Sequence, residues 1–324
     1  MRMVIVVICL LNAVIHIKVN AKTKVRIGLF NSLCKPDNEP FYLARSMGWF
    51  QKEGIDIENT NKDPRTFFRK KNHKNLGNYA NGDLYSSKFD VIVSGRARLY
   101  AIESNTPQRF KPFVANVQTT VNPAYAFLVN KKSHLKNIQE FTKGTILLDN
   151  NSGRAKRKLI AQILEKLKIN IKLIKIQISS IVDYNNHSNY DLLYVREPQL
   201  SILLKSGKYR ILDDGPVSKY IFSPWVMGFA SMSQSFLNKK PSVAKKIVKI
   251  WNRAINYKRT HKKKSRHILN KCGKINYNLE QLNIRSFIFW KKNEFNLNNI
   301  QKQINLYFKL GLISRKVSVK ELLK

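Results

Sequence analysis

Short polar segments follow several apolar runs in this sequence, and these segments are the candidates for binding a ligand. Ser94-Gly95 follows the run Phe89–Val93, and Asn151-Ser152-Gly153 follows Gly144–Leu148. Each segment precedes a helical pattern, so the backbone N–H groups at the helix start can hold an anion such as a sulfonate, carboxylate or phosphate. Ser and Asn are equally suited to capping these helices, which is the alternative interpretation.

Further polar residues at strand ends extend this candidate site. Asn31 and Ser32 follow the β-prone run 24–30, and Glu197 follows the run Tyr190–Tyr194. Glu197 can accept a hydrogen bond from an amine or a pyrimidine amino group. Alternatively, it caps the helix expected to start at Pro198.

Three aromatic residues lie near the same segments. Tyr42 is at a junction between a loop and a helix, and Tyr125 and Trp225 are where the chain is expected to cross between lobes. There they can stack on a flat ring of a ligand. Core packing or bracing of the crossovers is the alternative for each of them.

The sequence has no arrangement typical of catalysis or of a metal site. Its six histidines are scattered, and His134 and His187 have no Ser, Cys or carboxylate partner at motif spacing. There is no C-x-x-C pair and no His/Cys cluster, so we expect no catalytic residue, metal or cofactor. Whether Cys34 and Cys272 pair is left open by the sequence.

The first 21 residues have the three regions of a secretory signal peptide. Arg2 gives a positive start, Met3–Ile17 is almost entirely apolar, and Val19-Asn20-Ala21 supplies small or β-branched residues before a cut. The apolar stretch is shorter than the ~20 residues of a transmembrane helix, although an uncleaved anchor is the alternative. We therefore expect a periplasmic chain that starts at Lys22.

The charge of the chain is strongly positive, at +39 from 59 basic and 20 acidic residues. Such a balance is typical of proteins that bind nucleic acid or an anionic membrane. Here the basic residues are spread along the chain, with Lys258–Arg266 as the dense run, and the excess is in Lys, Ile and Asn together. That pattern favours compositional drift, so we expect no nucleic-acid partner.

Apolar runs alternate with helical patterns along the chain, and from Ser233 onward the pattern is helical. Strands are expected at 24–30, 55–58, 89–93, 111–117, 123–129, 144–148, 173–178, 190–194 and 209–212, and helices at 40–52, 96–104, 156–167, 198–206 and 241–257. This alternation predicts an α/β fold with largely parallel sheets. The sequence has no Gly/Ser/Pro-rich linker, so two lobes would be joined by crossing strands.

A series of motifs, ordered along the chain, carries a resemblance to a known family. They are Glu39–Glu58 (EPFYLARSMGWFQKEGIDIE), Phe89–Gly95 (FDVIVSG), Ser133–Gly144 (SHLKNIQEFTKG), Tyr194–Pro198 (YVREP), Phe236–Tyr257 (FLNKKPSVAKKIVKIWNRAINY) and the tail Val317–Leu323. On these the chain resembles the nitrate/sulfonate/taurine and thiamine-pyrimidine-precursor solute-binding proteins of ABC transporters. It departs from the family pattern at Arg96 and Arg98, which are unusually basic, at the polar turn Asn150-Asn151, and in the unfamiliar stretch 63–84.

The resemblance implies a type II periplasmic-binding-protein fold, with two α/β lobes joined by a hinge of crossover strands. Lobe 1 would comprise residues 22–118 and 216–324, and lobe 2 residues 119–215. The implied function is that of the solute-binding component of an ABC importer, which captures its solute by hinge closure and passes it to permease and ATPase subunits. The general rule that ligands bind at the carboxyl ends of strands in α/β sheets points to the same loops.

The sequence does not identify which solute is bound. A small anion, sulfonate-like or nitrate-like, and a thiamine pyrimidine precursor are both compatible with the loops. Contact with the membrane would come through the permease or an uncleaved anchor. The alternatives are a same-fold enzyme of thiamine or menaquinone precursor synthesis and a basic nucleic-acid-binding protein. Pyrimidine synthases of this fold carry a Cys-rich iron-binding segment that this sequence lacks.

Overall fold

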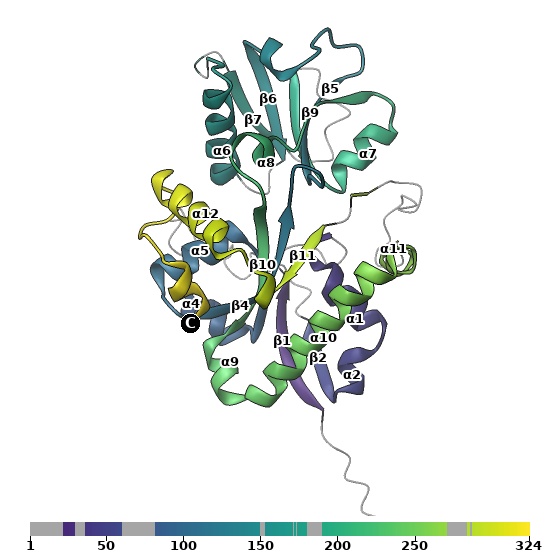
Figure 1. Cartoon of the computed structure of the whole chain (residues 1–324), viewed down its shortest axis with the longest axis vertical. Coiled ribbons are helices and arrows are strands. Elements are labelled where there is room, and N and C mark those ends of the chain that lie inside the picture. Colours follow the sequence, from purple (N-terminus) through teal and green to yellow (C-terminus); the bar gives the residue numbers. More distant parts are fainter. Residues whose placement is uncertain are drawn as a thin grey trace, which may run out of the picture.

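The computed structural model consists of two α/β lobes stacked along the long axis of the molecule (Figure 1). It describes residues 22–29, 36–59, 82–149, 153–170, 172, 174–179, 190–270, 284–285 and 287–324. Each lobe is built around one sheet, which confirms the predicted α/β class.

The first lobe contains a six-stranded sheet in the order β11-β4-β10-β3-β1-β2. Its strands are β1 (Thr23–Leu29), β2 (Ile55–Asn59), β3 (Val91–Gly95), β4 (Phe110–Gln118), β10 (Trp225–Ser233) and β11 (Ile288–Lys291). β1 is parallel to both β2 and β3, whereas β10 is antiparallel to β3 and β4. The sheet is therefore mixed and not largely parallel as predicted.

The second lobe repeats this strand order in a five-stranded sheet, β7-β6-β8-β5-β9. Its strands are β5 (Tyr125–Asn130), β6 (Gly144–Asp149), β7 (Ile174–Ser179), β8 (Leu192–Arg196) and β9 (Tyr209–Asp214). β6 is parallel to β7 and β8, and β5 is antiparallel to β8 and β9. β5 thus has the place in this sheet that β10 has in the other.

The chain passes between the two sheets twice. It leaves the first sheet at the end of β4 and enters the second at β5, then returns from β9 through the short helix α8 (Pro216–Tyr220) to β10. Because each connection joins the end of one strand to the start of the next, the carboxyl ends of β4 and β9 point toward the opposite lobe.

The helices cover both faces of the first sheet (Figure 1). They are α1 (Glu39–Ser46), α2 (Trp49–Lys52), α4 (Gly82–Lys88), α5 (Arg96–Asn105), α9 (Gln234–Lys239), α10 (Pro241–Thr260), α11 (Lys262–Asn270), α12 (Leu297–Lys309) and α13 (Val319–Leu323). The second lobe carries α6 (Gly153–Lys166) and α7 (Gln199–Lys205), and single 3₁₀ turns lie at Pro36–Asn38, Ile138–Glu140 and Lys292–Glu294.

The long helix α10 packs its apolar face on the first lobe through Trp251. The Trp251 ring stacks on Phe41 of α1, with ring centroids 5.6 Å apart. It also meets Phe50 and Phe113 edge-on, at 5.6 and 5.4 Å. Aromatic contacts of this geometry add to the hydrophobic gain from burying the rings, so α10 fixes α1 and the turn before it.

Three secondary-structure predictions were wrong in this lobe. The single helix expected over 40–52 is divided into α1 and α2, because Gly48 adopts the left-handed backbone (φ 67°) that favours glycine. The region after Ser233 is not wholly helical, since β11 pairs with β4. β10 was not predicted, because its sequence WVMGFASMS mixes Gly, Ala and Ser with large apolar residues and so shows neither alternation nor an unbroken apolar run.

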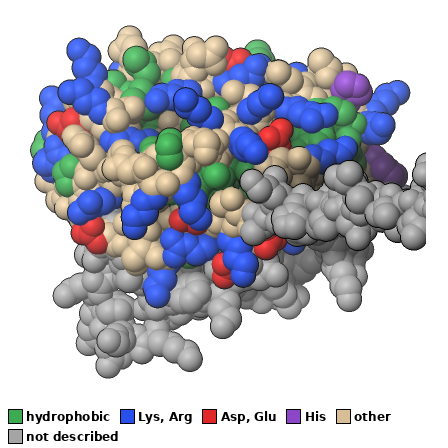
Figure 2. All heavy atoms as spheres, turned by 90° about the horizontal axis from the view of Figure 1, so that it is seen from below, with side chains coloured by type: hydrophobic (Ala, Val, Ile, Leu, Met, Phe, Trp, Pro, Cys, Tyr) green, Lys and Arg blue, Asp and Glu red, His purple; other side chains and the backbone are tan. Residues whose placement is uncertain are grey.

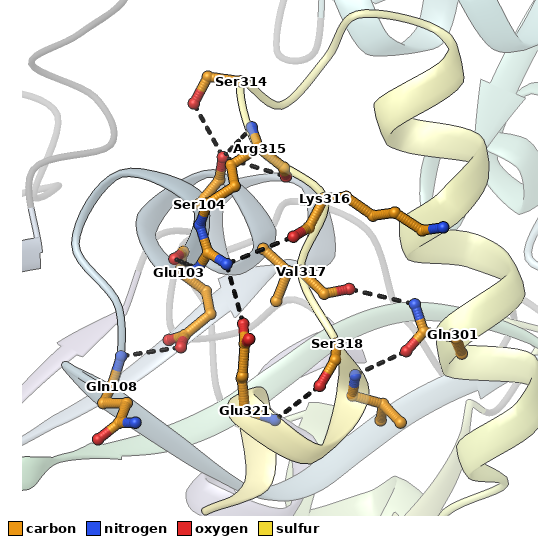
Figure 3. A network of polar contacts seen from close by, with 11 residues as sticks. Glu103, Ser104, Gln108, Gln301, Ser314, Arg315, Lys316, Val317, Ser318 and Glu321 are labelled. Atoms are coloured by element: carbon orange, nitrogen blue, oxygen red, sulfur yellow. Dashed lines mark hydrogen bonds and ion pairs between the residues drawn. The ribbon is translucent and has the colours of Figure 1, made fainter.

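The C-terminal tail ties α12 to α5 through a network of hydrogen bonds (Figure 3). The Arg315 backbone N–H donates to Ser104 Oγ at 2.7 Å, and its guanidinium donates to the Glu103 carbonyl at 3.2 Å and to Glu321 at 3.0 Å. The tail therefore holds α12, and with it Tyr307, beside α5.

The ion pair between Arg259 and Glu294 joins the end of α10 to the turn after β11. The two guanidinium nitrogens each approach one Glu294 oxygen at 2.7 Å. The Arg259 side chain lowers the pKa of Glu294 to about 2. A carboxyl group whose pKa is lower in the folded than in the unfolded state stabilises the fold above its unfolded pKa, and this contribution is lost as the pH falls toward the folded value.

We expect Glu294→Gln to lower the free energy of unfolding by about 1 kcal/mol at pH 7, since the pair is largely exposed to solvent. The deficit should shrink as the pH falls from about 4.5 toward about 2, which denaturant titrations at several pH values would measure. Glu53→Gln is the matched control, because Glu53 only meets Lys246 at 3.6 Å. A deficit that does not change with pH would contradict this account.

Candidate functional site

The two sheets face each other. The strand ends on the facing sides are the ones that the two crossovers connect. We call these residues the interlobe edge: Ser94, Gly95, Gln118, Tyr125, Arg196, Asp214 and Trp225. The lobes are in contact here, since Arg285, on the segment before β11, donates from Nη1 to Asp214 at the end of β9 at 2.6 Å. Ligands of open α/β sheets bind outside the carboxyl ends of the strands, which places the candidate site at this edge.

Tyr125 lies between aromatic and cationic side chains of the second lobe. Its ring stacks on Tyr194 with centroids 5.2 Å apart and planes 7° from parallel. Lys156 Nζ, from α6, lies 5.6 Å from the ring centre, and the Arg196 guanidinium carbon lies 5.7 Å from it. Cations near the face of an aromatic ring are stabilised by its quadrupole, so Tyr125 positions two positive charges at the interlobe edge.

An ion pair between Asp37 and Arg196 crosses from one lobe to the other. Asp37 is in the 3₁₀ turn before α1, and its carboxylate accepts hydrogen bonds from Arg196 and, at 2.6 Å, from Asn116 Nδ2. The Arg196 guanidinium also lies 5.1 Å from the Phe287 ring centre. Arg196 therefore connects β8 to two separate segments of the first lobe, the 3₁₀ turn with Asp37 and the segment before β11 with Phe287.

A small cavity lies beneath Asp37 in the first lobe. Its volume is about 10 Å³, which is room for roughly one water molecule. Its lining is mostly apolar, with polar groups from Asp37, Asn38 and Asn116. The lining includes none of the interlobe-edge residues, and the cavity is far smaller than the roughly 300 Å³ or more of a typical small-molecule site.

Arg96 is the first residue of α5 and contacts the interlobe edge from the first lobe. Its guanidinium carbon lies 4.9 Å from the Trp225 ring centre and 5.8 Å from that of Tyr307. Nη1 donates to the Met227 carbonyl at 3.2 Å, and Nε is buried without a hydrogen-bond partner among the described residues. No carboxylate in the described part of the chain forms an ion pair with Arg96.

Tyr307 connects Arg96 to Tyr125 electrostatically. Burial raises the pKa of the Tyr307 hydroxyl, and the Tyr125 hydroxyl raises it further, whereas the Arg96 guanidinium opposes the rise. Interactions of this kind require the groups to be close together. Arg96 therefore lies beside Tyr307 in the first lobe, and Lys156 and Arg196 lie beside Tyr125 in the second.

Glu197 is almost fully buried next to the edge and is held by Arg285. It accepts hydrogen bonds from Ser201 Oγ at 2.9 Å and from the Arg285 backbone N–H at 3.3 Å. Burial raises the pKa of the Glu197 carboxyl group, although these hydrogen bonds oppose that rise. Its contact with Ser201 in the first turn of α7 matches the helix-capping alternative.

The residues predicted for the site do not all lie together. Tyr125, Trp225, Ser94, Gly95 and Glu197 are at or beside the interlobe edge, and the Ser94 hydroxyl is buried with no described hydrogen-bond partner. Tyr42 is on α1 and makes no hydrogen bond or ring contact with them in the described structure. Gly153 is the first residue of α6. Asn31, Ser32, Asn151 and Ser152 lie outside the described residues.

Sequence reasoning missed five residues of this site: Asp37, Lys156, Arg196, Arg96 and Tyr307. Arg96 stood out as unusually basic, and Arg196 lies inside the YVREP motif, so both carried a signal. Asp37 and Tyr307 carried none. Their roles depend on contacts between segments far apart in the sequence.

The described residues contain no group of three or more His, Cys, Asp or Glu side chains that could hold a metal ion. Among the described helices, none is both long and apolar enough to span a bilayer.

Comparison with solved structures shows the fold. The chain is similar to the aliphatic sulphonate binding protein SsuA from Escherichia coli, at 14% identity and a TM-score of 0.67 over 93% of this chain and 92% of that one. It is similar to the alkanesulfonate-binding protein SsuA from Xanthomonas axonopodis bound to MOPS, at 15% identity and 0.64 over 93% and 97%. The desulfurization enzyme DSZB is also similar, at 11% identity and 0.65 over 93% and 96%.

No protein-family model and no curated protein matches the sequence. The chain therefore has the fold of periplasmic binding proteins, as the sequence motifs predicted, and this fold is shared by sulfonate-binding proteins and by an enzyme.

The ion pair between Asp37 and Arg196 should help to hold the lobes together. We expect Asp37→Asn to increase the population of an open form, because Arg196 loses its charged partner across the edge. Small-angle X-ray scattering would then show a larger radius of gyration in the variant than in the wild type. Arg210→Gln is the control, since Arg210 donates only to carbonyls of its own lobe. Equal radii for Asp37→Asn and the wild type would contradict this role.

Proposed function

We propose that this chain captures a small solute between its lobes and delivers it to the permease and ATPase subunits of an ABC importer. In this proposal the chain is exported to the periplasm after removal of residues 1–21. Residues 22–118 and 216–324 move as one lobe and residues 119–215 as the other. The fold supports this proposal because its sheets face each other with their carboxyl ends, and two short connections can act as a hinge.

The observation that carries the proposal is the unbalanced positive charge of Arg96 at the interlobe edge. Burying part of a charged group without a counter-charge is unfavourable, so such a group favours an anionic partner. The start of α5 adds the positive end of a helix dipole at the same place. The Ser94 hydroxyl is a further donor beside it.

A small oxoanion of the sulfonate or nitrate kind fits this donor set. Its charged group would contact Arg96 in the first lobe, and Lys156 or Arg196 would approach from the second. An organic remainder would lie on the stacked rings of Tyr125 and Tyr194. A flat pyrimidine on the same rings is the second candidate, with Glu197 accepting a hydrogen bond from its amino group.

A ligand that contacts both lobes favours closure of the hinge. A ligand shifts the equilibrium toward the closed form only by its difference in affinity for the two forms, and contacts with one lobe alone provide little difference. The Asp37–Arg196 pair already favours contact between the lobes. An anion that binds Arg196 would replace Asp37 as its counter-charge.

The fold alone does not separate a binding protein from an enzyme, since DSZB shares it. We propose a binding role with no catalytic step, because the residues at the edge are donors and aromatic rings suited to holding a ligand. A bound solute recovered chemically unchanged would support this, and a converted solute would support the enzyme alternative.

Thermal unfolding of residues 22–324 with single solutes tests the function. The panel is taurine, ethanesulfonate, nitrate, bicarbonate and hydroxymethylpyrimidine. A ligand at a hundred times its Kd should stabilise the fold by about 2.7 kcal/mol, which is a shift of several degrees. We expect a shift with at least one anion. A shift only with hydroxymethylpyrimidine would favour the heteroaromatic candidate, and a panel without any shift would contradict solute binding of these classes.

The role of Arg96 is tested by Arg96→Gln with Arg98→Gln as its matched control on the same helix. Both variants lose one positive charge. We expect Arg96→Gln to weaken binding of the anion found above at least ~10-fold in calorimetric titration, or about 1.4 kcal/mol. Arg98→Gln should change it less than ~3-fold, since Arg98 is half-buried two positions further along α5, and residues two apart on a helix do not share a face. Equal losses in both variants would rule out a specific contact with Arg96.

A further inference from the structure

The end of the first lobe that lies away from the interlobe edge is rich in lysine. Figure 2 views the molecule from this end, and Lys and Arg side chains cover much more of the described surface than acidic ones do. The segment 234–270, which forms α9, α10 and α11, contains 12 basic residues and no acidic residue. We call its exposed lysines at this end the basal ridge: Lys239, Lys240, Lys245, Lys246 and Lys249.

Little of the charge on the basal ridge is neutralised by the protein itself. Among the described residues, no carboxylate forms an ion pair with Lys239, Lys245 or Lys249. Lys246 meets Glu53 at 3.6 Å, and both side chains are exposed. Lys240 Nζ donates only to the Lys24 carbonyl, at 3.4 Å. Uncompensated charges of one sign on one face attract an extended surface of the opposite sign.

The chain enters the fold beside this ridge. The Thr23 backbone N–H donates to the Gly54 carbonyl at 2.9 Å at the start of β1, and Lys240 reaches the next residue, Lys24. Lys22, the first residue of the exported chain in the proposed function, is exposed and directly precedes this strand. It therefore adds a further positive charge at the same end of the first lobe as the basal ridge.

We propose that the basal ridge docks on an anionic lipid bilayer surface. The attraction of each lysine to anionic headgroups adds to that of its neighbours and decays over a Debye length, about 10 Å at 0.1 M salt. A ridge at the bilayer leaves the interlobe edge, at the other end of the first lobe, accessible to solute. This binding is independent of the proposed solute site.

The arrangement of the ridge favours a bilayer over a nucleic acid. Proteins that bind single strands place aromatic rings among their basic side chains, so that bases stack on them. Trp251, the aromatic residue in the middle of α10, is instead buried against Phe41. The exposed side of the helix therefore offers charge without a stacking surface.

Vesicle flotation tests the proposal on residues 22–324, which contain every described helix and strand. Vesicles of phosphatidylcholine with about 30 mol% phosphatidylglycerol are compared with pure phosphatidylcholine, at about 0.05 and 0.3 M salt. We expect binding to the anionic vesicles at least ~10-fold stronger than to the neutral ones, with a marked loss at the higher salt.

Two triple variants with the same change in charge locate the binding surface. Lys239→Glu, Lys245→Glu and Lys249→Glu together change the ridge, and Lys131→Glu, Lys132→Glu and Lys136→Glu change exposed lysines of the second lobe. We expect the ridge variant to lose at least ~10-fold in vesicle binding and the second-lobe variant less than ~3-fold. Matching melting temperatures for both variants and the wild type confirm that they are folded.

Two outcomes would overturn the proposal. Equal losses in both variants would show that only the net charge of the chain matters. A ridge variant that keeps its vesicle binding but loses binding to a DNA oligonucleotide would assign the ridge to nucleic acid. Neither outcome bears on solute binding, which the thermal panel measures separately.

Discussion

The structure depends on one topological constraint, the exchange of strands between the two lobes. The chain leaves the first sheet through β4 and returns to it through β10, which lies antiparallel between β3 and β4. In the second sheet β5 has the corresponding position, between β8 and β9. Both passages join the sheets at the carboxyl ends of their parallel strands. These ends therefore face each other, and any side chain placed there contacts the opposite lobe.

The distribution of charge at the interlobe edge follows from this geometry. Glu197 and Asp214 share Arg285, and Asp37 pairs with Arg196 across the two lobes. Arg96 alone among these groups is held by aromatic rings and a carbonyl instead of a carboxylate. On the basal ridge, Lys246 meets Glu53, whereas Lys239, Lys245 and Lys249 form no ion pair with a described carboxylate. The positive charge of Arg96 differs from those of the ridge lysines, because Arg96 is partly desolvated and the lysines are exposed to water.

Much of the fold was predictable from the sequence, because its strands and helices have strong periodic patterns. Alternation and buried runs located nine of the eleven strands in the described part of the chain to within a few residues, and the ordered motifs predicted the type of fold. β10 lacked a pattern because Gly, Ala and Ser interrupt its apolar residues. Gly48 was taken as part of one helix, although its positive φ divides that helix. These features depend on tertiary packing and not on local preference.

The candidate site was less predictable than the fold. Tyr125 and Trp225 were named because the chain had to cross between lobes near them, and the structure places both at the edge. Tyr42 was named because it lies at a junction between a loop and a helix, and it makes no hydrogen bond or ring contact with them in the described structure. The contact of Arg96 with Tyr307 needs α12 to be held beside α5 by the C-terminal tail, which no local pattern reveals.

Hydrogen exchange with and without an anion tests most directly whether solute binds between the lobes. The protein is residues 22–324 and the probe is ethanesulfonate at saturating concentration. If the solute binds between the lobes, amide exchange slows in both of them, at residues 95–99 around the start of α5 and at 194–197 around Arg196, with no change in α9 and the start of α10. Slower exchange confined to one lobe, or none at saturation, would contradict capture of a solute at the interlobe edge.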